Sequence, residues 1–302
     1  MTDELPPCPT AVTAASRSYA FLFHEIRPLT QLLIAPLAAT GVVIYASLWA
    51  YVSELIAFIS SGDARAASVA LGALAAGIFL CVFFAAIAVS SVTDLILGRQ
   101  SARGWIHLHP ARQDWRLYAA YLRFLLVLSG YLSAIYLLCA LALPALGAGR
   151  TTIGIVSVSA AIAGFYILFA RIGFLIPAIV TGSTGAVLRK ALHEGSGSFC
   201  RNLVLVVLLS VPGLVIQFAG EALFKAGTGS IRGVKLDLPI MLYARALESR
   251  LPEFALVFSL SGFVTLVLFA AGSVLSYRDQ LFVRRSHPMA AEPVANPDSV
   301  PV

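Results

Sequence analysis

The sequence predicts an all-α membrane protein, a polytopic helical bundle of about six transmembrane helices with short interfacial helices beside them. Composition is the first reason, because only 12% of the 302 residues are charged and 59% are hydrophobic. Soluble domains are roughly a quarter charged, so this much apolar surface needs lipid as well as a protein core. The second reason is that the apolar residues gather into six long runs with few charges.

Each of the six runs is long enough to cross a bilayer. A hydrocarbon core of about 30 Å needs roughly 20 helical residues at a rise of 1.5 Å per residue. We therefore expect residues 23–280 to form one transmembrane domain, and the Pro-, Ala- and Ser-rich residues 1–22 and 281–302 to be disordered cytoplasmic tails. The runs extend over Leu29 to Val52, Ser68 to Thr93, Leu117 to Leu143, Ile153 to Pro177, Leu203 to Leu223 and Phe254 to Ser276.

The distribution of Lys and Arg predicts the orientation. Outside the runs, twelve of these residues lie on the side of the two termini and seven lie on the other side. Because short cytoplasmic loops retain positive charge, both termini should lie in the cytoplasm, with the protein in a bacterial inner membrane. The basic residues occupy short loops and form no single stripe, so the expected partner of the net charge of +6 is anionic lipid and not nucleic acid.

Two connecting segments predict helices that lie flat on the membrane surface. From Pro239 to Leu251, most apolar residues fall on one helical face, and the segment from Val187 to Glu194 has the same pattern with basic residues opposite. Amphipathic segments of this kind bind the interface of a bilayer. The first should lie on the periplasmic surface and the second on the cytoplasmic surface.

No motif predicts a cofactor, a metal or a catalytic residue. His107 and His109 have no carboxylate or thiolate nearby, and none of the four cysteines shows the close spacing of a zinc site. The glycines after Glu194 lack the Gly-Lys-Ser/Thr ending of a phosphate-binding loop. No nucleophile and base are placed together, so we expect a protein that is not an enzyme.

Three ionisable residues in or near the spans are the candidates for a functional role, because charge inside a membrane is costly. Arg171 lies near the cytoplasmic end of the fourth run, where three roles stay open: reaching the headgroups, pairing internally, or contacting a substrate. Arg123 has a similar position in the third run, among aromatic residues. Asp94 is an acidic partner that either arginine could reach.

Small residues at four-residue spacing predict close helix packing. Such spacing lets two backbones approach each other in a bilayer, which indicates a compact bundle, a homo-oligomer or contact with a membrane partner. Prolines at positions 36, 177 and 212 should kink three of the spans. The predicted packing residues are Gly72, Ala76, Gly77 and Gly164.

The segment from Arg171 to Pro177, the basic stretch from Val187 to Glu194 and the entry Phe199-Cys200-Arg201 together carry a resemblance. In these features the chain resembles a family of six-helix bacterial inner-membrane proteins related to the membrane domain of some glycerophosphoryl diester phosphodiesterases. The resemblance implies a six-helix membrane fold. The sequence departs from the family's pattern at Thr181 and Gly182, where an acidic residue is expected. The resemblance does not extend to the phosphodiesterase domain, so catalysis does not carry over.

These observations predict a non-enzymatic membrane protein that organises lipids or partner proteins. The kinked spans and Arg171 leave open a transporter or permease subunit as the alternative. An intramembrane enzyme is the third hypothesis, and it has the least support in the sequence.

Overall fold

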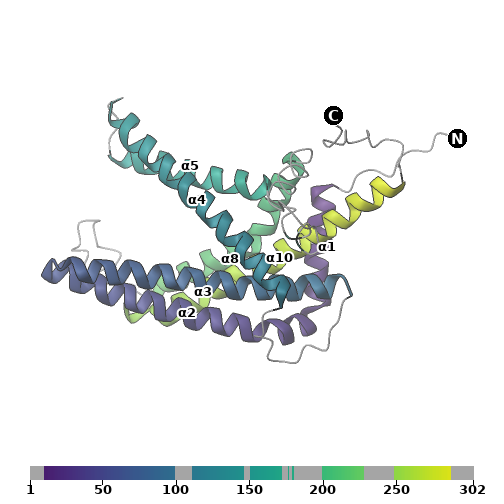
Figure 1. The fold of residues 1–302 in the computed structure, drawn as a ribbon, viewed down its shortest axis with the longest axis horizontal. Coiled ribbons are helices and arrows are strands. Elements are labelled where there is room, and N and C mark those ends of the chain that lie inside the picture. The colour runs from purple at the N-terminus through teal and green to yellow at the C-terminus, as the bar shows by residue number, and fades with distance from the viewer. Residues whose placement is uncertain are drawn as a thin grey trace, which may run out of the picture.

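The computed structural model describes residues 10–98, 111–145, 150–171, 176, 179, 199–227 and 248–286. Every regular element in these residues is a helix (Figure 1). Five of the helices are long and apolar enough to cross a membrane, and the apolar stretch Ile155–Arg171 is shorter. The predicted all-helical, multi-pass fold is confirmed. The helices are α1 (Ala11–His24), α2 (Ile26–Ser61), α3 (Ala64–Ile96), α4 (Arg112–Ala145), α5 (Arg150–Arg171), α8 (Phe199–Gly227) and α10 (Leu251–Ser286).

The helices α2 and α3 form an antiparallel pair joined by a two-residue turn. Gly62 ends α2 with a φ of 71°, a left-handed conformation that glycine adopts without steric cost. Asp63 then begins α3, because its carboxylate accepts a hydrogen bond of 2.8 Å from the backbone N–H of Arg65. This short connection fixes α2 and α3 side by side along most of their length (Figure 1).

α10 is the central helix of the bundle, and α4 lies at its periphery. α10 packs against α8, α2, α3 and α1. In the most apolar 18-residue stretch of each helix, 39% of the residues are buried in α10 but only 6% in α4. Helix α10 achieves this burial with small residues, among them Ala270 and Ala271, both with no exposed surface.

The largest core cluster lies at one end of the bundle, which is the predicted cytoplasmic end. It joins the first turns of α2 and the first half of α4 to the last third of α3 and the middle of α10, and its buried members include Leu29, Val92, Leu117 and Ala270. The opposite end has a cluster of two buried residues, Val52 and Leu251. Packing within the described residues is therefore concentrated toward one membrane surface.

The α4–α5 hairpin diverges from the rest of the bundle toward the opposite membrane surface. Figure 1 shows α4 and α5 side by side, diverging from the α2–α3 pair. The start of α4 belongs to the main core through Phe124 and Leu128. Further along α4, Tyr136 and Leu138 have 68% and 66% of their surface exposed. The far half of the hairpin consequently presents apolar side chains that the other described helices leave exposed.

The disordered tail predicted for residues 1–22 is wrong from residue 10 onward, because α1 is an ordered helix there. Thr10 begins it, accepting a 3.2 Å hydrogen bond from the backbone N–H of Thr13. The small residues Ala14, Ala15 and Ser18 are buried where α1 packs against α8 and α10. An alanine face of this kind carries little hydrophobic signal in the sequence, and its burial depends on the helices that receive it.

The C-terminal boundary also differs from the prediction, since α10 continues to Ser286, six residues past position 280. The predicted interfacial segment from Val187 to Glu194 and most of the one beginning at Pro239 lie outside the described residues. Glu248 and Ser249, from the end of that second segment, are helical immediately before α10.

Candidate functional site

The predicted packing residues divide into two groups in the structure. A Cβ atom added at Gly77 of α3 would lie 2.5 Å from the Cβ of Ser47 in α2. One added at Gly164 of α5 would lie 2.0 Å from the ring of Tyr131 in α4. Gly72 instead faces open space, and Ala76 is exposed on the same helix. Gly77 and Gly164 therefore mark the α2–α3 and α4–α5 contacts, whereas Gly72 and Ala76 face outward.

Proline 212 interrupts the hydrogen bonding of α8, and α1 supplies the missing donor. A proline has no N–H, so the carbonyl four residues before it loses its helical partner. Here that carbonyl belongs to Leu208, and it accepts a hydrogen bond from the hydroxyl of Tyr19. Side chains from neighbouring helices commonly satisfy such groups in membrane proteins. Tyr19 thus ties α1 to the break in α8.

A second contact beside the break joins α8 to α10. The hydroxyl of Ser261 donates a 2.8 Å hydrogen bond to the carbonyl of Gly213. A Cβ atom at Gly213 would lie 1.9 Å from the hydroxyl oxygen of Thr265. The absence of a side chain at this glycine lets the two helices approach closely. Pro36 lies inside α2 and is buried, and Pro177 lies outside the described residues.

The three ionisable candidates occupy different surroundings. Arg171, at the end of α5, is exposed, and its guanidinium carbon lies 5.3 Å from the centre of the Phe199 ring, a cation–π distance. Arg123 is exposed on α4, and Asp94 is half-buried in the last turn of α3. The structure thus brings Arg171 to the aromatic residue that begins α8.

Several buried polar residues at the same end of the bundle were not singled out by the sequence. Asp114, 1% exposed, accepts a 2.7 Å hydrogen bond from the backbone N–H of Ala111 through Oδ2, and its buried Oδ1 has no hydrogen-bond partner among the described residues. Asn202 lies opposite the carbonyl of Ala170, at 3.4 Å. The sequence signal for Asp114 was its place in the first turn of α4, where a carboxylate can bond back to the helix start.

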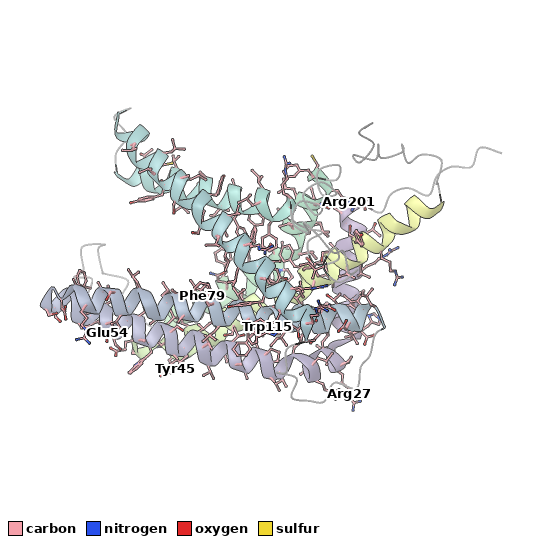
Figure 2. All side chains as sticks on the ribbon, in the orientation of Figure 1. Arg27, Tyr45, Glu54, Phe79, Trp115 and Arg201 are labelled. Atoms are coloured by element: carbon pink, nitrogen blue, oxygen red, sulfur yellow. The ribbon has the colours of Figure 1, made fainter. Side chains whose placement is uncertain are left out.

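Arg201 is another polar residue that joins two helices here. Its Nη2 atom donates a 2.8 Å hydrogen bond to the hydroxyl of Ser276, which connects the start of α8 to the second half of α10. Figure 2 labels Arg201. Ser276 is 1% exposed. A charged donor on a buried hydroxyl makes a strong hydrogen bond. Arg201 therefore fixes the relative position of these two helices near the predicted cytoplasmic surface.

An aromatic cluster connects α3 to α4 close to these polar residues. The ring of Phe83 lies 5.3 Å from that of Trp115 and 5.6 Å from that of Tyr118, measured between ring centres. Trp115 remains 52% exposed (Figure 2). Tryptophan and tyrosine are enriched at the level of the lipid headgroups. The start of α4 has the composition expected at a membrane surface.

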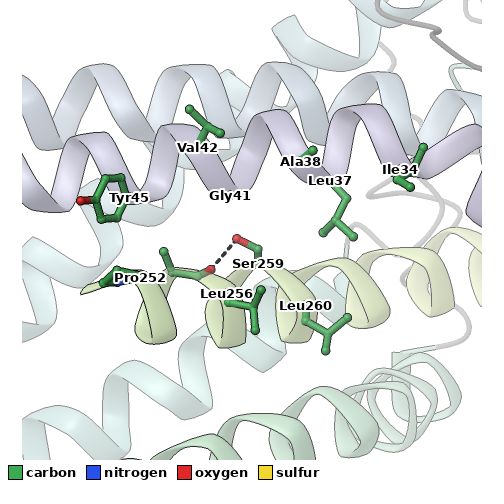
Figure 3. Close-up of a pocket in the computed structure, with 11 residues that line it drawn as sticks. Ile34, Leu37, Ala38, Gly41, Val42, Tyr45, Pro252, Leu256, Ser259 and Leu260 are labelled. Carbon is green, nitrogen blue, oxygen red and sulfur yellow. Dashed lines mark hydrogen bonds between the residues drawn. The ribbon is translucent and has the colours of Figure 1, made fainter. Parts of the chain in front are cut away.

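An apolar groove runs between α2 and α10, with a volume of about 570 Å³. Figure 3 shows the residues that line it, among them Ala38, Gly41 and Tyr45 on α2 and Leu256 and Ser259 on α10, with Ser259 pointing toward α2. The hydroxyl of Ser259 donates a 2.6 Å hydrogen bond to the carbonyl of Ala255 in its own helix, so it offers the groove no free donor. The groove is open along the surface of the two helices and can receive an apolar chain.

The geometry of these residues defines a class of protein, which is a multi-pass membrane protein. Among the described residues, no group of three or more His, Cys, Asp or Glu side chains could hold a metal ion. Comparisons with protein-family models, with curated proteins and with solved structures found no match to this chain. Its molecular function must therefore be argued from its own surfaces.

Proposed function

We propose that this chain is a non-enzymatic protein of a bacterial inner membrane, with cytoplasmic termini, that binds a partner protein inside the bilayer. The α4–α5 hairpin is the partner surface. The observation that carries this proposal is the divergence of the hairpin from the bundle (Figure 1). The far half of the hairpin carries apolar side chains that the other described helices leave exposed.

The two helices of the hairpin pack directly against each other, as a preformed binding surface requires. Tyr131 of α4 lies against Gly164 of α5, and Phe124 packs edge-to-face on Phe169 at 5.6 Å between ring centres. The exposed side of the hairpin combines large apolar residues, such as Leu126 at 73% exposure, with small ones, since Gly130 of α4 faces open space and Ala134 is exposed. Helix association in bilayers depends on such preformed packing faces, because apolar surface alone gives no driving force in lipid.

The inner-membrane location and the orientation rest on the excess of Lys and Arg in the connections on the side of the termini. A membrane surface on that side also agrees with the aromatic residues at the start of α4. The resemblance to six-helix bacterial inner-membrane proteins supports the same location.

Site-specific photo-crosslinking in living cells tests the partner surface. A photoreactive amino acid at Leu138 or Val158, both exposed on the hairpin, should give protein adducts of defined mass. The same amino acid at Leu71, equally exposed on α3, is the matched control and should give none. Adducts absent from the hairpin positions, or equally frequent at Leu71, would contradict the proposal.

A transporter or permease subunit is the second candidate function. The observation that favours it is the pair of prolines inside spanning helices, Pro36 in α2 and Pro212 in α8, since broken helices recur at transport sites. Thermal unfolding of the purified protein with anions, lipids or amino acids distinguishes the two functions. A stabilisation that depends on one soluble solute would favour transport.

A further inference from the structure

We propose that α1 is a membrane-embedded helix that does not cross the bilayer. It lies along one membrane surface, with Val12 and Phe23 among the acyl chains and with Thr13 and His24 toward the headgroups and water. This inference uses a different surface from the hairpin, and it holds whichever side of the membrane carries the termini.

The depth of α1 follows from the residues that it contacts. Its buried alanines pack on Leu205 and Leu209 of α8 and on Leu268 of α10. These three leucines lie within the stretches Phe199–Gly220 and Leu251–Arg278, which are long and apolar enough to cross a membrane. A helix that packs on the outside of such stretches shares their depth. The helix α1 therefore cannot lie wholly in water.

The length and direction of α1 exclude a further span. Its 14 residues extend about 21 Å at 1.5 Å per residue, and a hydrocarbon core is about 30 Å thick. Glu25, with φ of −99° and ψ of 21°, separates α1 from α2. Figure 1 shows that α1 runs across the direction of α2. Because α2 crosses the membrane, α1 lies along the membrane surface.

The exposed surface of α1 includes an apolar face beside the buried alanines. Val12 and Phe23 on this face are 64% and 70% exposed. Successive residues of a helix are turned by about 100°. These two residues, eleven positions apart in the sequence, consequently point in directions that differ by about 20°. Acyl chains can cover such a face at the level of the spans.

A polar face lies next to the apolar one. Thr13, Arg17 and His24 are exposed, and at about 100° per residue they fall within about 40° of one another and about 110° from the apolar face. Helices that lie in the interface of a bilayer combine an apolar and a basic face in this way. A protein contact inside the bilayer would instead bring the charge of Arg17 close to a buried interface, which is costly.

Fluorescence quenching in proteoliposomes tests the proposal. Single cysteines carrying a fluorescent label are placed by Val12→Cys, Thr13→Cys, Phe23→Cys and His24→Cys in full-length protein whose four native cysteines have been replaced. Each neighbouring pair has one residue on the apolar face and one on the polar face. Two quenchers are compared, which are phospholipids brominated near the glycerol end of their acyl chains and aqueous iodide on both sides of the membrane.

The labels should separate by face within each pair. Labels at positions 12 and 23 should lose about half of their fluorescence or more to the brominated lipid and little to iodide, because the apolar face of an interfacial helix lies about 5–10 Å inside the headgroup boundary. Labels at positions 13 and 24 should respond to iodide instead.

Two control positions calibrate the quenchers. Val42→Cys, 66% exposed in the middle of α2, should respond most to lipid brominated near the end of the acyl chain. Ser61→Cys, exposed at the end of α2, should respond to iodide. All six positions are exposed, so each variant should keep the circular dichroism spectrum of the wild type.

Three results would overturn the inference. Equal quenching by iodide at positions 12, 13, 23 and 24 would place α1 in water. Protection of positions 12 and 23 from both quenchers would show that protein covers the apolar face. Quenching at these positions by the deeply brominated lipid, as strong as at position 42, would show that α1 does not lie at the surface. Loss of hairpin adducts would contradict only the partner surface, and each of these three results only this inference.

Discussion

Replacing Gly77 by alanine should destabilise the protein through the α2–α3 contact. The new methyl group would lie 2.5 Å from the Cβ of Ser47, and ordinary contact begins at 3.4 Å. The position of a Cβ atom is fixed by its backbone, so no change of side-chain rotamer relieves this clash and the helices must separate by about an ångström. Overpacking of this kind costs about 1–3 kcal/mol.

The substitution also raises the helix propensity of α3, which stabilises the protein, and this contribution must be subtracted. Alanine is about 1 kcal/mol more favourable than glycine inside a helix. Gly72→Ala makes the same change in α3, one turn and a half away, where the added methyl group meets open space. The difference in unfolding free energy between Gly77→Ala and Gly72→Ala should therefore be about 1–3 kcal/mol, with Gly77→Ala the less stable.

Reversible unfolding in mixed micelles, followed by circular dichroism, measures this difference. The variant Ser47→Gly removes the opposing Cβ, so Gly77→Ala in that background should recover most of the lost stability, a coupling of about 0.5–3 kcal/mol. If Gly77→Ala and Gly72→Ala were equally stable, the close approach of α2 and α3 at this glycine would be refuted.

Further predictions concern Tyr19 and Asp114. Tyr19→Phe removes the hydrogen bond to the Leu208 carbonyl and should cost about 0.6 kcal/mol, at most about 1.7, in the same assay. Burial raises the pKa of Tyr19 above its ordinary value of 10.0, so its contribution is fully present below pH 10 and is lost as the pH rises through the raised value. Wild type and Tyr19→Phe should therefore converge in stability in alkali, and a gap that persisted would contradict the hydrogen bond. Asp114→Ala removes the acceptor of the Ala111 N–H and should cost about 0.5–2 kcal/mol, with faster hydrogen exchange in the first turn of α4. Asp114→Asn keeps an acceptor there and should exchange nearly as slowly as wild type.

The spans could be predicted from the sequence because hydrophobicity is a local property. Each predicted run lies within one helix as far as the residues are described, as Leu29 to Val52 lies within α2. A stretch of some twenty apolar residues has few alternatives to a membrane helix, whatever surrounds it. Which helices pack against each other, by contrast, depends on residues that are far apart in the sequence.

The small residues show that helix packing cannot be predicted from the local sequence alone. Gly72 and Gly77 lie in the same helix and both belong to four-residue repeats of small residues. Of the two, Gly77 alone faces another of the described helices. The spacing identifies helix faces that permit close approach. Which of these faces of α3 makes a contact depends on where α2 lies beside it.

The same limit applies to the polar residues and to α1. The sequence predicted that Pro212 would break α8, but not that the hydroxyl of Tyr19, far away in the chain, would satisfy the freed carbonyl. The alanines of α1 have too little apolar surface to predict burial. They are buried because α8 and α10 present a matching surface.

The measurement that tests the account most directly is a cysteine-accessibility map of the chain in its membrane. Single cysteines at Ser61, Ser101, Ser196, Ser230 and Ser286 are introduced into a protein whose four native cysteines have been replaced. A reagent that cannot cross the membrane should label only positions 61 and 230 from the outside. Labelling from the outside at position 101, 196 or 286 would contradict the six-span arrangement with cytoplasmic termini, and with it the partner surface as oriented here.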